Sequence, residues 1–194
     1  MISCMLVIIS FGLMFLSDMQ KLAGRRRLGQ YLFIIGMMVL AAAGINSAMS
    51  SSRFQTAPLM KILFLLIALA AAVLEYLALF SSLPAFSTYL GDDEPRQLVD
   101  SGMYALCRHP GALWFPLFSL SLALGIGNWE LLASAGLASA LNLLYVWFQD
   151  RLVFPKTIDH YAQYRERTPF VIPTAQSISR AIGKESKSRL NDEV

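Results

Sequence analysis

A cation, an imidazole and a proline follow one another at Arg108, His109 and Pro110, directly before an apolar run. Arg108 offers a planar fork of donors with a fixed positive charge, and His109 can donate or accept a proton near neutral pH. Because proline fits the first turn of a helix, we expect a helix to begin at Gly111. A helix start attracts anions. The segment predicts a site for an anionic or zwitterionic ligand, although a charged flank among lipid headgroups fits equally well.

A second group of polar residues closes the last apolar run of the chain. Gln149 and Asp150 stand at its end, where they can complete a pocket begun by Arg108. Tyr161 and Tyr164 follow three residues apart, so they share one face of a short helix. The two tyrosines either line the same pocket or anchor the chain at a membrane interface.

Two polar residues lie inside apolar runs. Glu75 is the one carboxylate deep in such a run, and Asn46 is an amide in another. Acidic side chains within a membrane are costly and often functional. Glu75 therefore contacts either a polar group of a substrate or a neighbouring helix, and the same two readings stand for Asn46.

Apolar runs of membrane-spanning length must position these residues. A span needs about 20 mostly apolar residues. Between two of the runs, Asn128, Trp129 and Glu130 form a short polar break that predicts a helical hairpin with Trp129 at the interface. We expect an all-α, polytopic membrane protein of about five transmembrane helices, with spans near 2–17, 30–48, 59–83, 112–127 and 130–148.

Composition supports a membrane protein and excludes several other classes. Of the 194 residues, 56% are hydrophobic and 15% are charged, against about a quarter charged in soluble domains. The net charge of +3 indicates no nucleic-acid partner, and no obligate protein partner is evident. Cys4 and Cys107 form no CxxC pair and no cluster with a histidine, so we expect small apolar fillers and no metal site.

The distribution of charge predicts the orientation in the membrane. Fourteen of the sixteen Lys and Arg residues fall on one side of the predicted spans, and Arg53 and Lys61 fall on the other. The positive-inside rule then puts the N-terminus outside and the C-terminus in the cytoplasm. We expect the membrane to be a bacterial inner membrane or its equivalent. We read residues 1–17 as a retained span rather than a signal peptide, 1–175 as one membrane-embedded domain, and 176–194 as a polar, flexible tail.

The stretch from Arg96 to Pro173 resembles the group of integral membrane enzymes formed by isoprenylcysteine carboxyl methyltransferases and phospholipid methyltransferases. Several blocks of that family pattern occur here in the same order. They are Leu98-Val99-Asp100-Ser101-Gly102-Met103-Tyr104, Arg108-His109-Pro110, Tyr161 with Tyr164, and Pro169-Phe170-Val171-Ile172-Pro173.

The resemblance implies S-adenosyl-L-methionine as cofactor, held in a pocket on the cytoplasmic side. It implies methyl transfer to a lipid-like or small amphipathic acceptor, which can be a carboxylate, an amine or a thiol. Arg108 would meet the cofactor carboxylate, and Asp150 or Glu75 would take a proton from an amine acceptor. The matching cofactor positions are Arg96, Gln97, Leu98, Val99, Tyr104, His109, Pro110, Gly111, Ala112 and Gln149.

Three positions depart from the family pattern. Ala112 replaces a tyrosine, Gln149-Asp150 replaces a glutamate pair, and Tyr145 stands where the family has a substrate-facing arginine. The resemblance therefore supports the cofactor site more strongly than recognition of a prenylcysteine carboxylate. Two alternatives remain open. One is an NADPH-dependent membrane reductase similar to the sterol reductases, echoed by 167–170, and the other is a non-catalytic member of the fold.

Overall fold

A computed structural model describes residues 1–81 and 98–182, and all regular structure in these ranges is helical. The helices, π-helices included, are α1 (Ile2–Leu22), α2 (Arg26–Met49), α3 (Pro58–Tyr76), η1 (Leu77–Ser81), α5 (Met103–Leu106), α6 (Gly111–Ile126), α7 (Trp129–Phe148), η2 (Gln149–Val153), α8 (Phe154–Thr157) and α9 (Tyr161–Arg167). Residues 175–182 are also helical.

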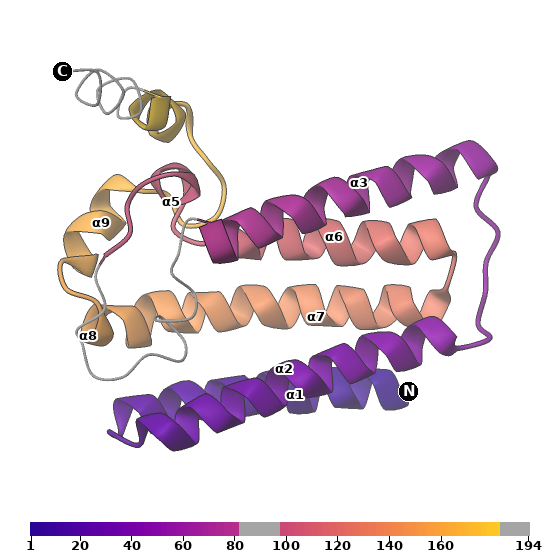
Figure 1. The fold of residues 1–194 in the computed structure, drawn as a ribbon, viewed down its shortest axis with the longest axis horizontal. Coiled ribbons are helices and arrows are strands. Elements are labelled where there is room, and N and C mark those ends of the chain that lie inside the picture. The colour runs from indigo at the N-terminus through magenta and orange to yellow at the C-terminus, as the bar shows by residue number, and fades with distance from the viewer. Residues whose placement is uncertain (82–97, 183–194) are drawn as a thin grey trace.

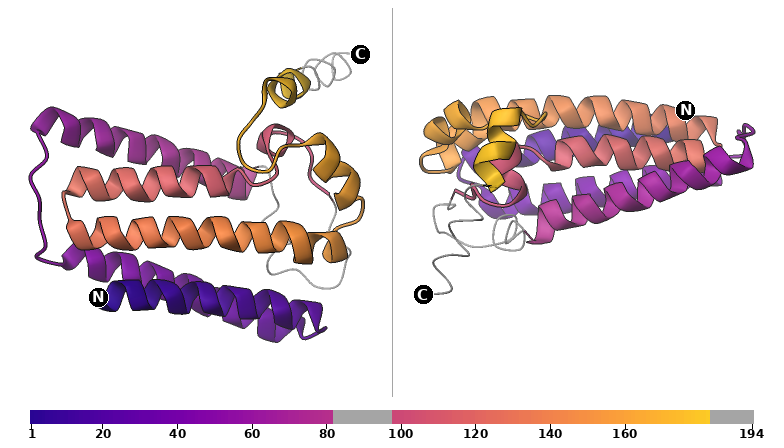
Figure 2. Two further views of the ribbon diagram at one scale, coloured as in Figure 1. Left: turned by 180° about the vertical axis from the view of Figure 1, so that it is seen from behind. Right: turned by 90° about the horizontal axis from the view of Figure 1, so that it is seen from above.

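The long helices run side by side and the short ones gather at one end. Helix α7 lies in the middle of Figure 1, with α6 and α3 on one side of it and the α1–α2 hairpin on the other. Helices α5, α8 and α9 lie together at the end where α7 finishes, as both further views also show (Figure 2). The residues singled out at 98–110 and 149–173 are thereby brought to the same end of the bundle.

In the described part of the chain, four helices are long and apolar enough to cross a membrane, which confirms the all-α class and four of the five predicted apolar spans. They cover Ile2–Leu22, Arg26–Met49, Pro58–Phe80 and Trp129–Thr157, and the shorter apolar helix Gly111–Ile126 packs among them. Large apolar side chains such as Met38, Leu66 and Leu69 stand exposed on α2 and α3. A soluble protein rarely exposes so much contiguous apolar surface.

The first span was predicted too short, because Asp18 and Lys21 were taken as its polar end. Helix α1 continues to Leu22. The Asp18 carboxylate is buried, with Lys21 Nζ at 3.4 Å and one hydrogen bond each from α7 and η2. A buried charge is tolerated when it is paired and hydrogen-bonded, so the helix can continue past Asp18.

Small residues allow α1 and α2 to approach closely. Ser3, Ser10 and Ser17 are fully buried and stand seven residues apart along α1. They face buried Gly29, Gly36 and Ala43, which repeat at the same interval along α2. A Cβ on Gly36 would stand 3.0 Å from the Ser10 carbonyl oxygen. Close backbone contact of this kind stabilises helix pairs in membranes, where apolar burial between helices gains little.

The predicted hairpin between α6 and α7 is confirmed. Gly127 ends α6 in the left-handed region at a φ of 70°, and the buried Asn128 side chain accepts a hydrogen bond from the Leu131 amide at 3.0 Å. This is a glycine stop followed by an asparagine N-cap. Trp129 is exposed at the turn, with its ring 4.6 Å from that of Phe54.

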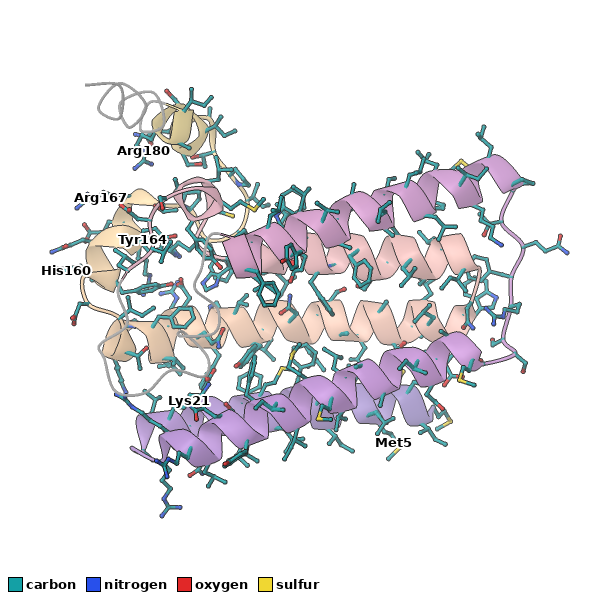
Figure 3. All side chains as sticks on the ribbon, in the orientation of Figure 1. Met5, Lys21, His160, Tyr164, Arg167 and Arg180 are labelled. Atoms are coloured by element: carbon teal, nitrogen blue, oxygen red, sulfur yellow. The ribbon has the colours of Figure 1, made fainter. Side chains whose placement is uncertain are left out.

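Positive charge gathers at the end of the bundle that holds α5, α8 and α9. Among the described Lys and Arg residues, Arg53 and Lys61 are the two at the opposite end. Figure 3 labels Lys21, Arg167 and Arg180 at the crowded end. The segment predicted as a flexible tail, 176–194, begins inside a helical stretch that covers 175–182, and Arg180 donates a hydrogen bond to the Arg167 carbonyl.

Candidate functional site

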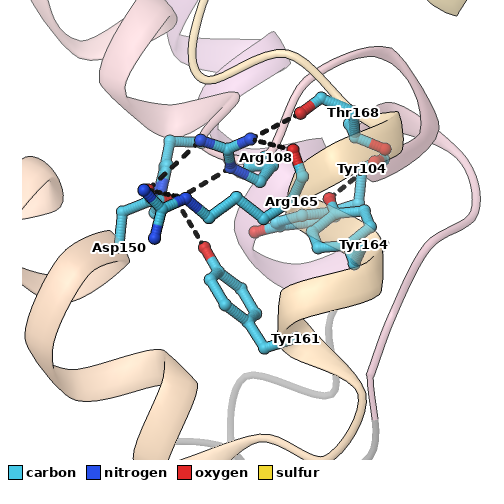
Figure 4. A network of polar contacts seen from close by, with 8 residues as sticks. Tyr104, Arg108, Asp150, Tyr161, Tyr164, Arg165 and Thr168 are labelled. Atoms are coloured by element: carbon cyan, nitrogen blue, oxygen red, sulfur yellow. Dashed lines mark hydrogen bonds and ion pairs between the residues drawn. The ribbon is translucent and has the colours of Figure 1, made fainter.

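Arg108 is the centre of a polar network that ties three segments together (Figure 4). Its Nε and Nη2 donate to Asp150 Oδ1 and Oδ2 at 2.8 and 3.2 Å. Its Nη1 donates to the carbonyls of Arg165 and Thr168 at 2.8 and 2.6 Å. The planar fork of arginine suits such a bidentate pair with a carboxylate. The guanidinium therefore holds η2 against the end of α9 and the residue that follows it.

Asp150 accepts hydrogen bonds from three different side chains. Besides Arg108, His109 Nε2 lies 3.2 Å and Tyr161 Oη 2.7 Å from Oδ1. Arg165 Nε stands 3.7 Å from Oδ2. A buried carboxylate that already accepts these donors between two guanidinium groups is a poor acceptor for a substrate proton. The geometry gives Asp150 a positioning role and argues against the role as base considered from the sequence.

The π-helix η2 sets the directions of Gln149 and Asp150. Asp150 faces the Arg108 network, whereas Gln149 Nε2 donates to Asp18 Oδ2 at 2.8 Å. Tyr145 Oη donates to the same oxygen at 2.7 Å. A π-helix widens one turn of a helix and is frequent at functional sites. The expectation that Gln149 contacts a cofactor is thus not supported, because its amide ties η2 to α1.

His109 is buried between aromatic rings. Its imidazole stacks on Phe154 with centroids 5.7 Å apart and meets the edge of Phe170 at 5.1 Å. Burial lowers the pKa of His109 below its usual value, which favours the neutral imidazole. Since Asp150 is the acceptor, Nε2 carries the hydrogen in that form.

Backbone pairing closes the site between segments far apart in the sequence. The Arg108 amide donates to the Pro169 carbonyl at 2.9 Å, and the His109 amide donates to the Phe170 carbonyl at 3.1 Å. The two family-like blocks at 108–110 and 169–173 therefore lie against each other. The sequence predicted both blocks but not their pairing.

The two tyrosines of α9 face inward. Tyr161 bonds Asp150, and Tyr164 Oη donates to the Tyr104 carbonyl at 2.7 Å. Both side chains are buried, and burial raises the pKa of both phenols. The interfacial-anchor interpretation is wrong for these residues, because their hydroxyl groups bond the protein interior.

The other predicted cofactor positions are described by their burial and by one contact of Tyr104. Leu98 and Val99 are half-buried. Tyr104 lies in α5, and its carbonyl accepts the hydrogen bond from Tyr164. Ala112 is buried in the first turn of α6. Arg96 and Gln97 lie outside the described residues.

Helix α6 starts where the sequence predicted, but some of its first backbone N–H groups already have acceptors within the protein. The helix begins at Gly111 with Pro110 as its N-cap. The Ala112 amide already donates to the His109 carbonyl at 3.1 Å, and the Leu113 amide donates to the Pro110 carbonyl at 3.0 Å. Fewer N–H groups remain for an anion than the sequence predicted.

Glu75 lies beside this helix start. A Cβ on Gly111 would stand 3.2 Å from Glu75 Oε1, so the carboxylate packs directly on the glycine. Asn46, the other polar residue of the apolar runs, donates to Ser3 Oγ at 2.8 Å and so serves a helix contact. Cys107 is buried, and burial raises the pKa of its thiol to about 11, as suits an apolar filler.

Sequence reasoning missed Asp18 and Phe154. Asp18 follows Phe11 and Met14 on the same face of α1, at helical spacing from the buried stripe. That spacing was a usable signal that its carboxylate points inward. Phe154 follows the π-helix and gave no such signal. Among the described residues, no cluster of His, Cys, Asp or Glu is arranged to hold a metal ion.

Comparison with known proteins adds no relative. No protein family, no curated protein and no solved structure matches this chain.

Proposed function

We propose that this chain is an integral membrane methyltransferase that uses S-adenosyl-L-methionine and acts on a lipid-like or small amphipathic acceptor. The observation in its favour is the meeting of the family-like blocks at one end of the bundle. The segments around Arg108, Asp150 and Thr168 are bonded together, although 42 and 60 residues separate Arg108 from its two partners.

The proposal includes a place in the membrane. Four long apolar helices and the shorter α6 would give five crossings. The Lys and Arg residues at the end with α5, α8 and α9 favour the cytoplasmic side for the site under the positive-inside rule. The membrane would be a bacterial inner membrane or its equivalent.

The residues present fit the cofactor in part. Half-buried Leu98 and Val99 offer backbone groups and an apolar edge, which suit an adenosine. Arg108 is already bonded to Asp150 and to two carbonyls, so we assign it to holding the site rather than to a ligand carboxylate. Bound S-adenosyl-L-methionine supplies an electrophilic methyl group. The protein would contribute positioning and the exclusion of water.

Transfer of a labelled methyl group tests the function. The purified protein, reconstituted in vesicles of mixed bacterial lipids, is incubated with methyl-labelled S-adenosyl-L-methionine, and label is counted in the lipid extract and in added small acceptors. We expect label to move into one of these fractions. NADPH consumption in place of label transfer would support the reductase alternative, and neither activity in a folded protein would support the non-catalytic one.

A further inference from the structure

The link between α2 and α3 encloses a cavity of about 390 Å³ against the end of α6. This link cavity is lined by Phe54, Gln55, Thr56, Pro58 and Lys61 on one side and by residues 125–127 on the other. It lies at the end of the bundle opposite to α5, α8 and α9 (Figure 1). Its volume falls in the range of small-ligand sites, and the function proposed above assigns no ligand to it.

Hydrogen bonds and close packing tie the walls of the link cavity together. The Phe54 amide donates to the Gly127 carbonyl at 2.8 Å, and Thr56 Oγ1 donates to the Leu124 carbonyl at 3.1 Å. A Cβ on Gly127 would stand 2.5 Å from the Phe54 carbonyl oxygen, so glycine is what allows the link to approach α6 this closely. The cavity therefore belongs to a fixed arrangement of link and helix rather than to a loose loop.

Lys61 gives the link cavity a net positive charge. Its side chain is exposed, and its ammonium makes no hydrogen bond or ion pair with a described residue. Glu130, a carboxylate at the same end of the bundle, is already bonded to Ser3 and the N-terminal ammonium. The start of α3 and the end of α6 add opposite partial charges of about half an elementary charge each, which offset one another. The cavity therefore suits an anion.

Exposed apolar surface continues from Lys61 along α3. Leu65 and Leu69 follow Lys61 at four-residue intervals, so the three side chains lie in one row along the helix. Leu65 is 38% exposed and Leu69 is 63% exposed. At the edge of the cavity, the Phe54 ring centroid lies 4.6 Å from that of exposed Trp129, and tryptophan is typical of the headgroup level of a bilayer. A cation at headgroup level with apolar surface beside it matches an anionic lipid.

We propose that the link cavity binds the phosphate of an anionic glycerophospholipid whose headgroup carries no amine, as in phosphatidylglycerol. The Lys61 ammonium donates to one phosphate oxygen, and the side-chain amide of Gln55, which lines the same cavity, donates to another. An acyl chain lies along Leu65 and Leu69. Such a lipid has no amine, carboxylate or thiol, so it is a bound lipid and not the methyl acceptor. The site is independent of the proposed function, because the Arg108 network lies at the other end of the bundle.

Native mass spectrometry of the full chain in detergent tests this binding, because it counts the lipids that the protein retains at each added concentration. The probes are phosphatidylglycerol, phosphatidylcholine with the same acyl chains, and glycerol 3-phosphate as a soluble phosphate ester. We expect one phosphatidylglycerol to bind more tightly than either of the other two. Equal affinity for the two lipids overturns the proposal, and equal affinity for phosphatidylglycerol and glycerol 3-phosphate overturns a lipid as the occupant.

Substitution of Lys61 locates the bound lipid. Lys61→Gln removes the charge, and we expect it to weaken phosphatidylglycerol binding at least fivefold, whereas Lys61→Arg keeps the affinity. Arg53→Gln is the matched control, because it removes an equal charge at the same end from a residue that does not line the cavity and whose guanidinium donates to the Ala48 carbonyl at 2.9 Å. We expect this control to bind as the wild type does. Equal losses in Lys61→Gln and Arg53→Gln, or wild-type affinity in a folded Lys61→Gln protein, overturn the site.

Discussion

At the residue scale, one carboxylate organises the site. Asp150 is fully buried and receives bonds from Arg108, His109 and Tyr161, which come from two other segments. A buried ion pair contributes little net stability against an apolar replacement, but removing one partner leaves the other charge uncompensated. The role of Asp150 is therefore to fix where Arg108 and His109 lie.

Replacement of Asp150 tests this role. Asp150→Ala leaves the Arg108 guanidinium without its carboxylate, and we expect a loss of about 3 kcal/mol in the free energy of unfolding. Unfolding in mixed micelles of increasing denaturing detergent measures it. Arg165→Gln is the control, because that side chain is partly exposed and 3.7 Å away, so we expect a change of about 0–1 kcal/mol. Equal losses in the two variants would remove Asp150 from the centre of the network.

At the element scale, helix packing depends on where side chains are absent. The α1–α2 pair is held by small residues repeating every seven positions, and α6 meets Glu75 at a glycine. The π-helix η2 turns Gln149 toward α1 and Asp150 toward Arg108. The helix starts at Gly111 and Trp129 were predictable from local proline, glycine and asparagine signals. The π-helix was not predictable from local signals, and its first residue, Gln149, bonds Asp18, which is 131 residues away in the sequence.

A pair of glycines in α2 tests the packing. Gly36→Leu forces a side chain against Ser10 and Met14 of α1, and we expect a loss of about 1–3 kcal/mol in the free energy of unfolding. Gly44→Leu makes the same change in the same helix. A Cβ on Gly44 would meet no atom of another helix within 4 Å, so this variant is the matched control. The same detergent-unfolding assay compares them. Equal stability of both variants would contradict the close α1–α2 contact.

At the scale of the whole molecule, apolar runs predicted the architecture well. The length of the apolar runs predicted the long helices, because this signal is local. The asymmetry of Lys and Arg predicted a common end for the polar residues, because it adds up along the chain. The sequence predicted which residues belong to the candidate site better than it predicted which of them contact one another. Arg108, His109 and Tyr161 were named, but not that Asp150 is their shared partner, nor that the Gln149 amide donates to Asp18. These contacts could not be predicted, because side-chain direction depends on partners far away in the sequence.

We propose that the end of the bundle with α5, α8 and α9 binds S-adenosyl-L-methionine. Calorimetric titration of the detergent-purified chain with that cofactor, its demethylated product and NADPH tests it most directly. We expect micromolar binding of the first two, at least a tenfold loss, about 1.4 kcal/mol, in His109→Ala, and unchanged affinity in His160→Asn, where asparagine suits the left-handed backbone of that exposed residue. Binding of NADPH alone, or of none of the three by the folded wild type, would contradict the account.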